Sequence, residues 1–113
     1  MNYTNKIVPF IVIKEKFVPQ LSEKDAVAHA HLLKALGDPT RLRILSLLSR
    51  HEGEMCVSEI TECFTLTQPT ISSHLRVLWT AGLIESRKKG LCIYYYVKRE
   101  KLAHVKNILD ELA

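Results

Sequence analysis

The stretch that decides the fold is TQPTISSHLRVLWTAGLIESRKKGLCIYYYV, residues 67–97. Its first part, residues 68–81, carries apolar side chains at a period of 3.6, which predicts a helix, and Gly82 is a typical end for one. Two apolar runs follow, residues 83–86 and 91–97, and the basic sequence RKKG between them predicts a hairpin with a charged tip. A helix followed at once by a basic hairpin is typical of the second half of a winged helix-turn-helix.

Further helices are predicted on both sides of this unit. Ser22 can cap a helix that runs to Leu36 and stops at Gly37, and Asp38 can cap the next one, residues 39–49. A short helix is expected over residues 57–63 and a last one over residues 99–112. The predicted fold class is therefore mainly α with a β-hairpin wing (α+β), a winged helix-turn-helix of about five helices.

The length and composition fit one small domain. The chain has 113 residues, of which 47% are hydrophobic and 25% are charged, as in ordinary globular proteins. The domain is expected to span residues 22–113. Residues 1–21, which contain Pro9, Pro19 and many residues that favour extended structure, are predicted to form a separate N-terminal arm. The net charge of +4 is mild, so the position of the basic residues matters more than their number.

The cellular compartment is predicted from what the sequence lacks. Three cysteines are an odd number, and with no secretory signal they indicate free thiols in a reducing cytosol. The apolar run over residues 7–18 is interrupted by charges and too short to span a bilayer. A cytoplasmic protein without a membrane partner is expected.

The predicted 68–81 helix has the side chains of a DNA-reading helix. The N-terminal end of such a helix reaches base edges, and short hydroxyl and amide groups there can contact bases or phosphates. The alternative is an ordinary solvated helix face, which the neighbouring basic hairpin disfavours. The candidate DNA-binding residues on this helix are Thr67, Gln68, Thr70, Ser72, Ser73, His74 and Arg76.

The predicted hairpin tip adds a second set of candidate DNA contacts. Arg87, Lys88 and Lys89 are expected to touch phosphates or enter the minor groove beside the helix. Such contacts give affinity that depends on salt and little sequence information. The alternative is a turn that only improves solubility.

The last predicted helix carries an apolar stripe that suggests a dimer. Leu102, Val105, Leu109 and Leu112 fall on one side at helical spacing. A terminal helix of a small domain has few other surfaces to cover, so these residues are candidates for a homodimer interface.

Four segments of the chain occur in an order that is found in one protein family: LKALGDPTRLRILSLL, GEMCVSEI, TQPTISSHLRVLWTAGLI and RKKGLCIYYYV. Through these segments the chain resembles the ArsR/SmtB family of winged-helix repressors. The resemblance covers about residues 27–112. It implies a homodimer paired through its first and last helices, which binds a double-stranded DNA operator with an imperfect inverted repeat. It also implies that an inducer releases the repressor from that operator.

The resemblance is incomplete where some relatives bind arsenite or soft metals. Those members carry a Cys-Val-Cys-Asp element, whereas this chain has Cys56-Val57-Ser58-Glu59, so only the first thiol remains. Cys56 is the leading candidate metal ligand, and arsenite or a thiophilic divalent ion is the candidate inducer. Cys63 is a weaker candidate, because seven residues of helix place it ~10 Å from Cys56. A small buried apolar role is expected for Cys63, and a structural role for Cys92.

Other regulatory inputs stay open. The His and Asp ligands of a zinc site on the last helix are absent, although Glu100 and His104 lie four residues apart, and His51 lies in the turn near Cys56. A redox response of Cys56 is a second possibility, and release without direct sensing is a third.

An enzymatic function is not indicated by the sequence. The chain has no Gly-rich phosphate loop, no His-Glu-x-x-His and no nucleophile elbow. A DNA-binding transcriptional repressor is the favoured function. A winged-helix protein-interaction domain without DNA binding is the alternative.

Overall fold

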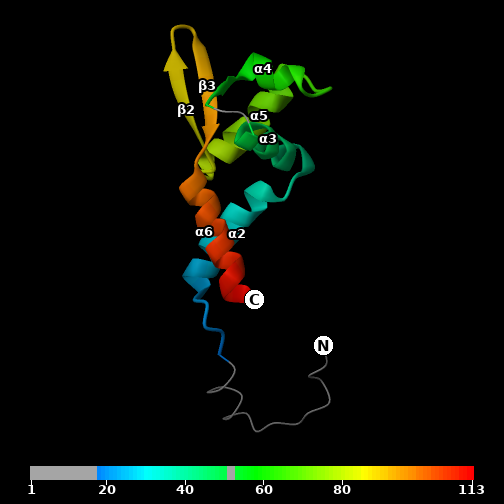
Figure 1. Ribbon diagram of the computed structural model, residues 1–113. Coiled ribbons are helices and arrows are strands. Elements are labelled where there is room, and N and C mark those ends of the chain that lie inside the picture. Colours follow the sequence, from blue (N-terminus) through cyan, green and yellow to red (C-terminus); the bar gives the residue numbers. More distant parts are fainter. Residues whose placement is uncertain (1–17, 51–52) are drawn as a thin grey trace.

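The computed structural model describes residues 18–50 and 53–113 and shows the expected winged helix-turn-helix. Most of the proposed arm, residues 1–17, and His51 lie outside the described residues. In Figure 1 the hairpin and α4 lie at one end of the molecule and α2 and α6 lie side by side at the other. None of the helices in the described ranges is long and apolar enough to cross a membrane.

Five helices are present among the described residues, in agreement with the sequence. They are α2 (Glu23–Leu36), α3 (Pro39–Arg50), α4 (Val57–Glu62), α5 (Gln68–Thr80) and α6 (Arg99–Leu112). The two predicted caps are confirmed: the Asp25 amide donates to Ser22 Oγ over 3.1 Å, and the Arg41 amide donates to Asp38 Oδ2 over 3.1 Å. These bonds satisfy amides that have no partner within their own helix.

The sheet has three antiparallel strands in the order β1-β3-β2, with β1 (Met55–Cys56), β2 (Ile84–Lys89) and β3 (Cys92–Val97). The short strand β1 is not evident in the sequence, because two residues carry no alternation to read. Met55 pairs with Tyr95 and Cys56 pairs with Tyr94, so the segment before α4 is tied to the hairpin.

The predicted position of the hairpin tip is wrong. Arg87, Lys88 and Lys89 belong to β2 and pair with Tyr94, Ile93 and Cys92. The turn consists of Gly90 and Leu91 instead, and Gly90 has a φ of 61°, a left-handed conformation that glycine adopts without strain. The basic residues therefore alternate between the two faces of the hairpin.

The core lies where the helices meet the base of the hairpin. Its fully buried side chains come from α3, α4, α5, the residue before β2 and the first residue of β2: Ile44, Leu48, Ile60, Ile71, Leu75, Leu78, Leu83 and Ile84. Because α5 contributes three of these side chains, its orientation is held by the core, and its other faces are left for contacts with a partner.

Candidate nucleic-acid interface

Helix α5 presents a polar surface because most of its apolar residues are turned inward or toward the hairpin, although Val77 is exposed on the side of α2 and α6. Ile71, Leu75 and Leu78 are buried. The helix begins at Thr67, whose hydroxyl accepts from the Thr70 amide over 3.4 Å and lies 3.0 Å from the Thr70 hydroxyl. The predicted contact residues that are exposed on this surface are Thr67, Gln68, Thr70, Ser72, Ser73 and Arg76.

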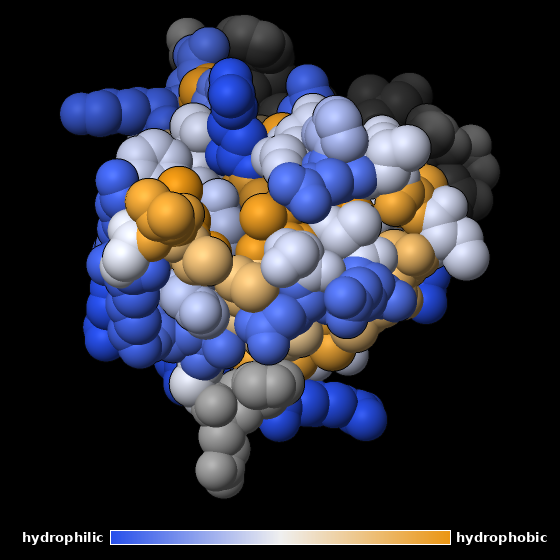
Figure 2. All heavy atoms as spheres, turned by 90° about the horizontal axis from the view of Figure 1, so that it is seen from above, coloured by the Kyte–Doolittle hydropathy of each residue, from blue (hydrophilic) through white to orange (hydrophobic). Residues whose placement is uncertain are grey.

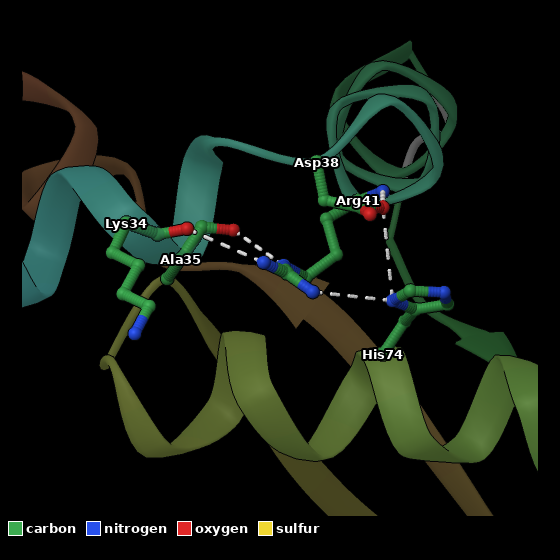
Figure 3. A network of polar contacts seen from close by, with 5 residues as sticks. All are labelled: Lys34, Ala35, Asp38, Arg41 and His74. Carbon is green, nitrogen blue, oxygen red and sulfur yellow. Dashed lines mark hydrogen bonds and ion pairs between the residues drawn. The ribbon is translucent and has the colours of Figure 1, made fainter.

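His74 is different from the other predicted contact residues, since its side chain is only 20% exposed. Its Nδ1 lies 3.3 Å from Arg41 Nη1 and 3.7 Å from Asp38 Oδ2, and Figure 3 shows the ring turned toward both. A guanidinium can only donate, so the contact with Arg41 makes Nδ1 the acceptor. The neutral ring then carries its proton on Nε2.

Arg41 is a functional candidate that the sequence reasoning missed. Its Nε donates to Ala35 O over 2.6 Å and its Nη2 donates to Lys34 O over 3.2 Å. These carbonyls lie in the last turn of α2, where the Lys34 carbonyl also accepts from the Gly37 amide over 3.0 Å, whereas carbonyls this close to a helix end lack an i+4 amide within the helix. One side chain thus joins the end of α2 to His74 of α5 (Figure 3). The motif Gly-Asp-Pro-Thr-Arg contains Arg41, but the motif alone does not reveal this contact.

The carboxylate of Asp38 completes this network. The hydrogen bond from the Arg41 amide is the main reason that the pKa of Asp38 lies below its ordinary value, and the positive charge of Arg41 acts in the same direction. Asp38 therefore stays ionised. His74 Nδ1 lies between the Arg41 guanidinium and the Asp38 carboxylate, and these two contacts orient the ring.

The hairpin directs its three cations to different sides. Ser86, Ile93 and Tyr95 line a hollow of about 260 Å³ together with side chains of α5, so this face of the sheet is turned toward α5. Lys88 pairs with Ile93 and shares that face. Arg87 and Lys89 lie on the opposite face, where both form ion pairs with Glu54.

The end of the molecule that carries the hairpin has a mostly polar surface. Figure 2 looks onto this end, where hydrophilic side chains project outward and hydrophobic atoms show in patches between them. One hydrophobic side chain at the tip, Leu91, is 99% exposed, and Trp79 on α5 is 52% exposed. Polar surfaces with few apolar contacts are usual for proteins that bind nucleic acid.

The predicted dimer residues of α6 divide into two groups. Val105 is buried and Leu102 packs against the core of its own subunit. Leu109 and Leu112 are 52% and 66% exposed, and Val27 of α2 is 53% exposed. Since α2 and α6 lie side by side (Figure 1), this end of the molecule presents apolar side chains that none of the residues described in the structure covers.

The cysteines do not form the three-thiol site that arsenite needs. Cys56 begins α4 and Cys63 ends it, so the two thiols lie at opposite ends of the helix. The expectation that Cys63 is buried is wrong, because it follows the last turn of α4 and is exposed. In the described part of the chain, no three His, Cys, Asp or Glu side chains are placed to hold a metal ion.

Cys56 and Cys92 instead lie on either side of Tyr94. Cys56 pairs with Tyr94 across β1 and β3, and Cys92 lies two residues earlier on β3, on the same face. Negative charge on Cys92, followed by burial and by negative charge on Cys56, raises the pKa of Tyr94. Cys56 Sγ also lies 3.2 Å from Ser58 Oγ, the residue that replaces the second thiol of the arsenite-binding element.

Comparison with known proteins agrees with this geometry. The model of the family described as bacterial regulatory protein, arsR family, matches residues 38–86. An uncharacterized HTH-type transcriptional regulator of Methanocaldococcus jannaschii is 43% identical over 83 residues, which are 74% of this chain and 92% of that protein. The arsenical resistance operon repressor of Staphylococcus xylosus is 40% identical over 79 residues, covering 70% of this chain and 74% of that protein.

A solved structure is similar over most of the fold. The homodimeric winged helix-turn-helix DNA-binding domain of a possible ArsR-family transcriptional regulator from Mycobacterium bovis has a TM-score of 0.64 at 31% identity. The similarity covers 85% of this chain and 89% of that one. The matched family model spans α3 to the start of the hairpin, which includes the whole of α5. The chain therefore belongs to the arsR family of bacterial regulatory proteins, and it is a DNA-binding transcriptional regulator and not an enzyme.

Proposed function

We propose that two copies of this chain bind an inverted-repeat operator in the cytoplasm and repress the gene that follows it. The observation that carries the proposal is the exposed polar surface of α5, which is fixed to the core by Ile71, Leu75 and Leu78. A recognition helix needs both properties, a rigid mount and a polar face that fits the major groove.

The proposed contacts with DNA come from α5 and the hairpin. The exposed hydroxyl and amide groups at the start of α5 are of the kinds that read bases or bind phosphates, and Arg76 suits a guanine or a phosphate. Lys88 is the hairpin cation that shares the α5 side. The proposed DNA-contacting residues are Thr67, Gln68, Thr70, Ser72, Ser73, Arg76 and Lys88, with His74 held by Arg41 behind them.

The proposed dimer uses the exposed apolar residues of α2 and α6. A two-fold dimer places two copies of α5 in successive major grooves, ~34 Å apart, and therefore requires an operator with two-fold symmetry. The similar Mycobacterium bovis domain is described as homodimeric, which supports the same state for this chain.

The inducer is proposed to act at Cys56. The Staphylococcus xylosus relative is named for arsenical resistance, and Cys56 is the thiol that this chain keeps from the arsenite-binding element. The described residues do not supply three thiolates to one ion, so an ion bound here would need further ligands. An oxidant that modifies Cys56 is the second candidate.

Fluorescence anisotropy on DNA from upstream of the gene tests the proposed operator binding. Arg76→Ala and Ser73→Ala are each expected to weaken binding by roughly 1–3 kcal/mol, because each removes a polar group that is placed to meet the DNA. Lys24→Ala, which removes an exposed cation from the far end of α2, is the matched control and is expected to bind nearly as well as wild type. Unchanged affinity in the α5 variants, or no affinity in wild type, would favour the protein-interaction domain.

The same assay separates the candidate inducers when the DNA complex is titrated with arsenite, cadmium and zinc. Release of wild type but not of Cys56→Ser by one ion identifies Cys56 as a ligand. If no ion releases the DNA and a peroxide does, the redox response is supported. If neither acts, Cys56 is not the regulatory residue.

A further inference from the structure

Glu54 is the residue that holds two of the three hairpin cations. Its Oε2 lies 3.6 Å from Arg87 Nε, and its Oε1 forms a close ion pair with Lys89 Nζ. The guanidinium of Arg87 lies 5.4 Å from the Tyr96 ring centre, and Lys89 Nζ lies 5.5 Å from that of Tyr94. Both cations are thus drawn across the face of the sheet that is turned away from α5.

Glu54 depends on these ion pairs more than Arg87 and Lys89 do, because it is the more buried group. The Glu54 side chain is 14% exposed, whereas those of Arg87 and Lys89 are 58% and 55% exposed. Glu54 Oε2 is buried and makes no hydrogen bond in the described structure, so its charge depends on the two nearby cations. The cations, in contrast, could face water or a phosphate at little cost, since they are already half exposed.

We infer that Glu54 competes with DNA phosphates for Arg87 and Lys89, and so limits the affinity of the hairpin for DNA. Lys88, on the other face, is outside this competition. The inference rests on the proposed DNA binding. It adds Glu54 to the residues that set the affinity for DNA, although Glu54 itself would not contact the DNA. It predicts that the hairpin contributes less to the salt dependence of binding than its three cations suggest.

The test is the substitution Glu54→Gln, which keeps the shape of the side chain and removes its charge. Each cation that gains a phosphate steepens the plot of log affinity against log salt by about 0.9. A dimer has two hairpins, so the slope is expected to steepen by roughly 1–4, with an affinity gain of about fivefold or more near 0.1 M salt. Anisotropy with an operator duplex, measured over a series of NaCl concentrations, gives both quantities.

Glu85→Gln is the matched control. Glu85 lies on β2, two residues before Arg87 and therefore on the same face, and its partner Lys98 is outside the hairpin strands. It loses the same charge, so any general effect of net charge appears in both variants. An equal gain in the two variants, or no gain in Glu54→Gln, would overturn the inference, while a wild type that binds no DNA would instead overturn the proposed function.

A second comparison covers the case in which Glu54→Gln unfolds. In the chain that keeps Glu54, Lys88→Ala is expected to weaken binding more than the double variant Arg87→Ala/Lys89→Ala, although it removes fewer cations. If the double variant loses more affinity than Lys88→Ala, Arg87 and Lys89 already contact DNA and Glu54 does not restrain them. Thermal unfolding of each variant shows whether a loss of affinity reflects a loss of folded protein.

Discussion

Arg41 joins the last turn of α2 to the middle of α5 through three contacts of its guanidinium group. Because α2 belongs to the proposed dimer end and α5 to the DNA side, this side chain couples the two. The planar fork of arginine reaches two carbonyls and a ring nitrogen at once, which lysine cannot do.

Substitution of Arg41 should therefore affect DNA binding as well as stability. Arg41→Ala is expected to lower the free energy of unfolding by about 1–3 kcal/mol, because the Ala35 carbonyl loses its donor and the Lys34 carbonyl keeps only the Gly37 amide. Arg41→Lys is expected to restore only part of this loss. DNA affinity should fall in both Arg41 variants.

The contact between Arg41 and His74 can be tested by a double-mutant cycle. His74→Ala should add little once Arg41 is replaced by alanine, with a coupling of about 0.5–1.5 kcal/mol. Anisotropy and urea unfolding of Arg41→Ala, His74→Ala and the double variant Arg41→Ala/His74→Ala measure this coupling, and strictly additive effects would contradict it.

Single residues also show which features can be predicted from the sequence. Ser22 and Asp38 were predictable as caps, because a cap depends on residues three positions apart. The contact between Arg41 and His74 spans 33 positions, and the ion pairs of Glu54 depend on how β1 meets the hairpin. Such contacts arise from tertiary packing, and no local pattern in the sequence encodes them.

At the scale of elements, the helices were predictable and the hairpin only in part. Periodic apolar residues, with caps at α2 and α3 and glycine ends at α2 and α5, define these three helices to within a residue or two of the observed bounds. The run Arg87-Lys88-Lys89 has no alternation of polar and apolar residues, so it reads as a loop although it pairs along β3. Pairing with β3 decides its structure, and that pairing depends on the turn at Gly90.

The end of α5 provides a prediction for a single element. Gly82 has a φ of 76°, and a Cβ atom there would lie 2.9 Å from Lys101 Cε. Gly82→Ala is therefore expected to destabilise the protein by about 1 kcal/mol or more, because alanine is strained at positive φ. Gly37→Ala is the control, since Gly37 has a φ of −82° that alanine adopts readily. Urea unfolding midpoints compare the two, and equal shifts would show that the backbone of Gly82 is not the cause.

At the scale of the whole molecule, the two ends differ in character. The hairpin end shows hydrophilic side chains with hydrophobic patches between them (Figure 2) and carries the hairpin cations, whereas the α2 and α6 end exposes Val27, Leu109 and Leu112. The sequence predicted the apolar stripe of α6 but not its division, because periodicity cannot tell a residue that packs within the subunit from one that is left exposed. Val105 is buried and Leu109 is exposed because of how α6 packs against α2 and the core, which the sequence alone does not show.

Disruption of the apolar end should dissociate the dimer without unfolding the subunit. Leu109→Glu places a charge where an exposed leucine stands, so the monomer loses little while a buried interface would leave that charge unpaired. Sedimentation is expected to show monomers, and operator affinity should fall by about tenfold or more, since one half-site alone is bound. Leu91→Glu, at the still more exposed leucine of the hairpin tip, should remain dimeric. Dimers in both variants would place the interface elsewhere.

The chain has one tryptophan, and Trp79 lies on α5 beside the hairpin, half exposed and lining the hollow with Ile93 and Tyr95. Its indole is therefore a built-in optical probe at the junction of the two proposed DNA-contacting elements. Tryptophan emission excited at wavelengths where the four tyrosines do not absorb needs no dye, and it comes from the place where helix and hairpin meet. A spectral change on adding operator, or on adding an inducer to the complex, would report the geometry of that junction in the unmodified protein.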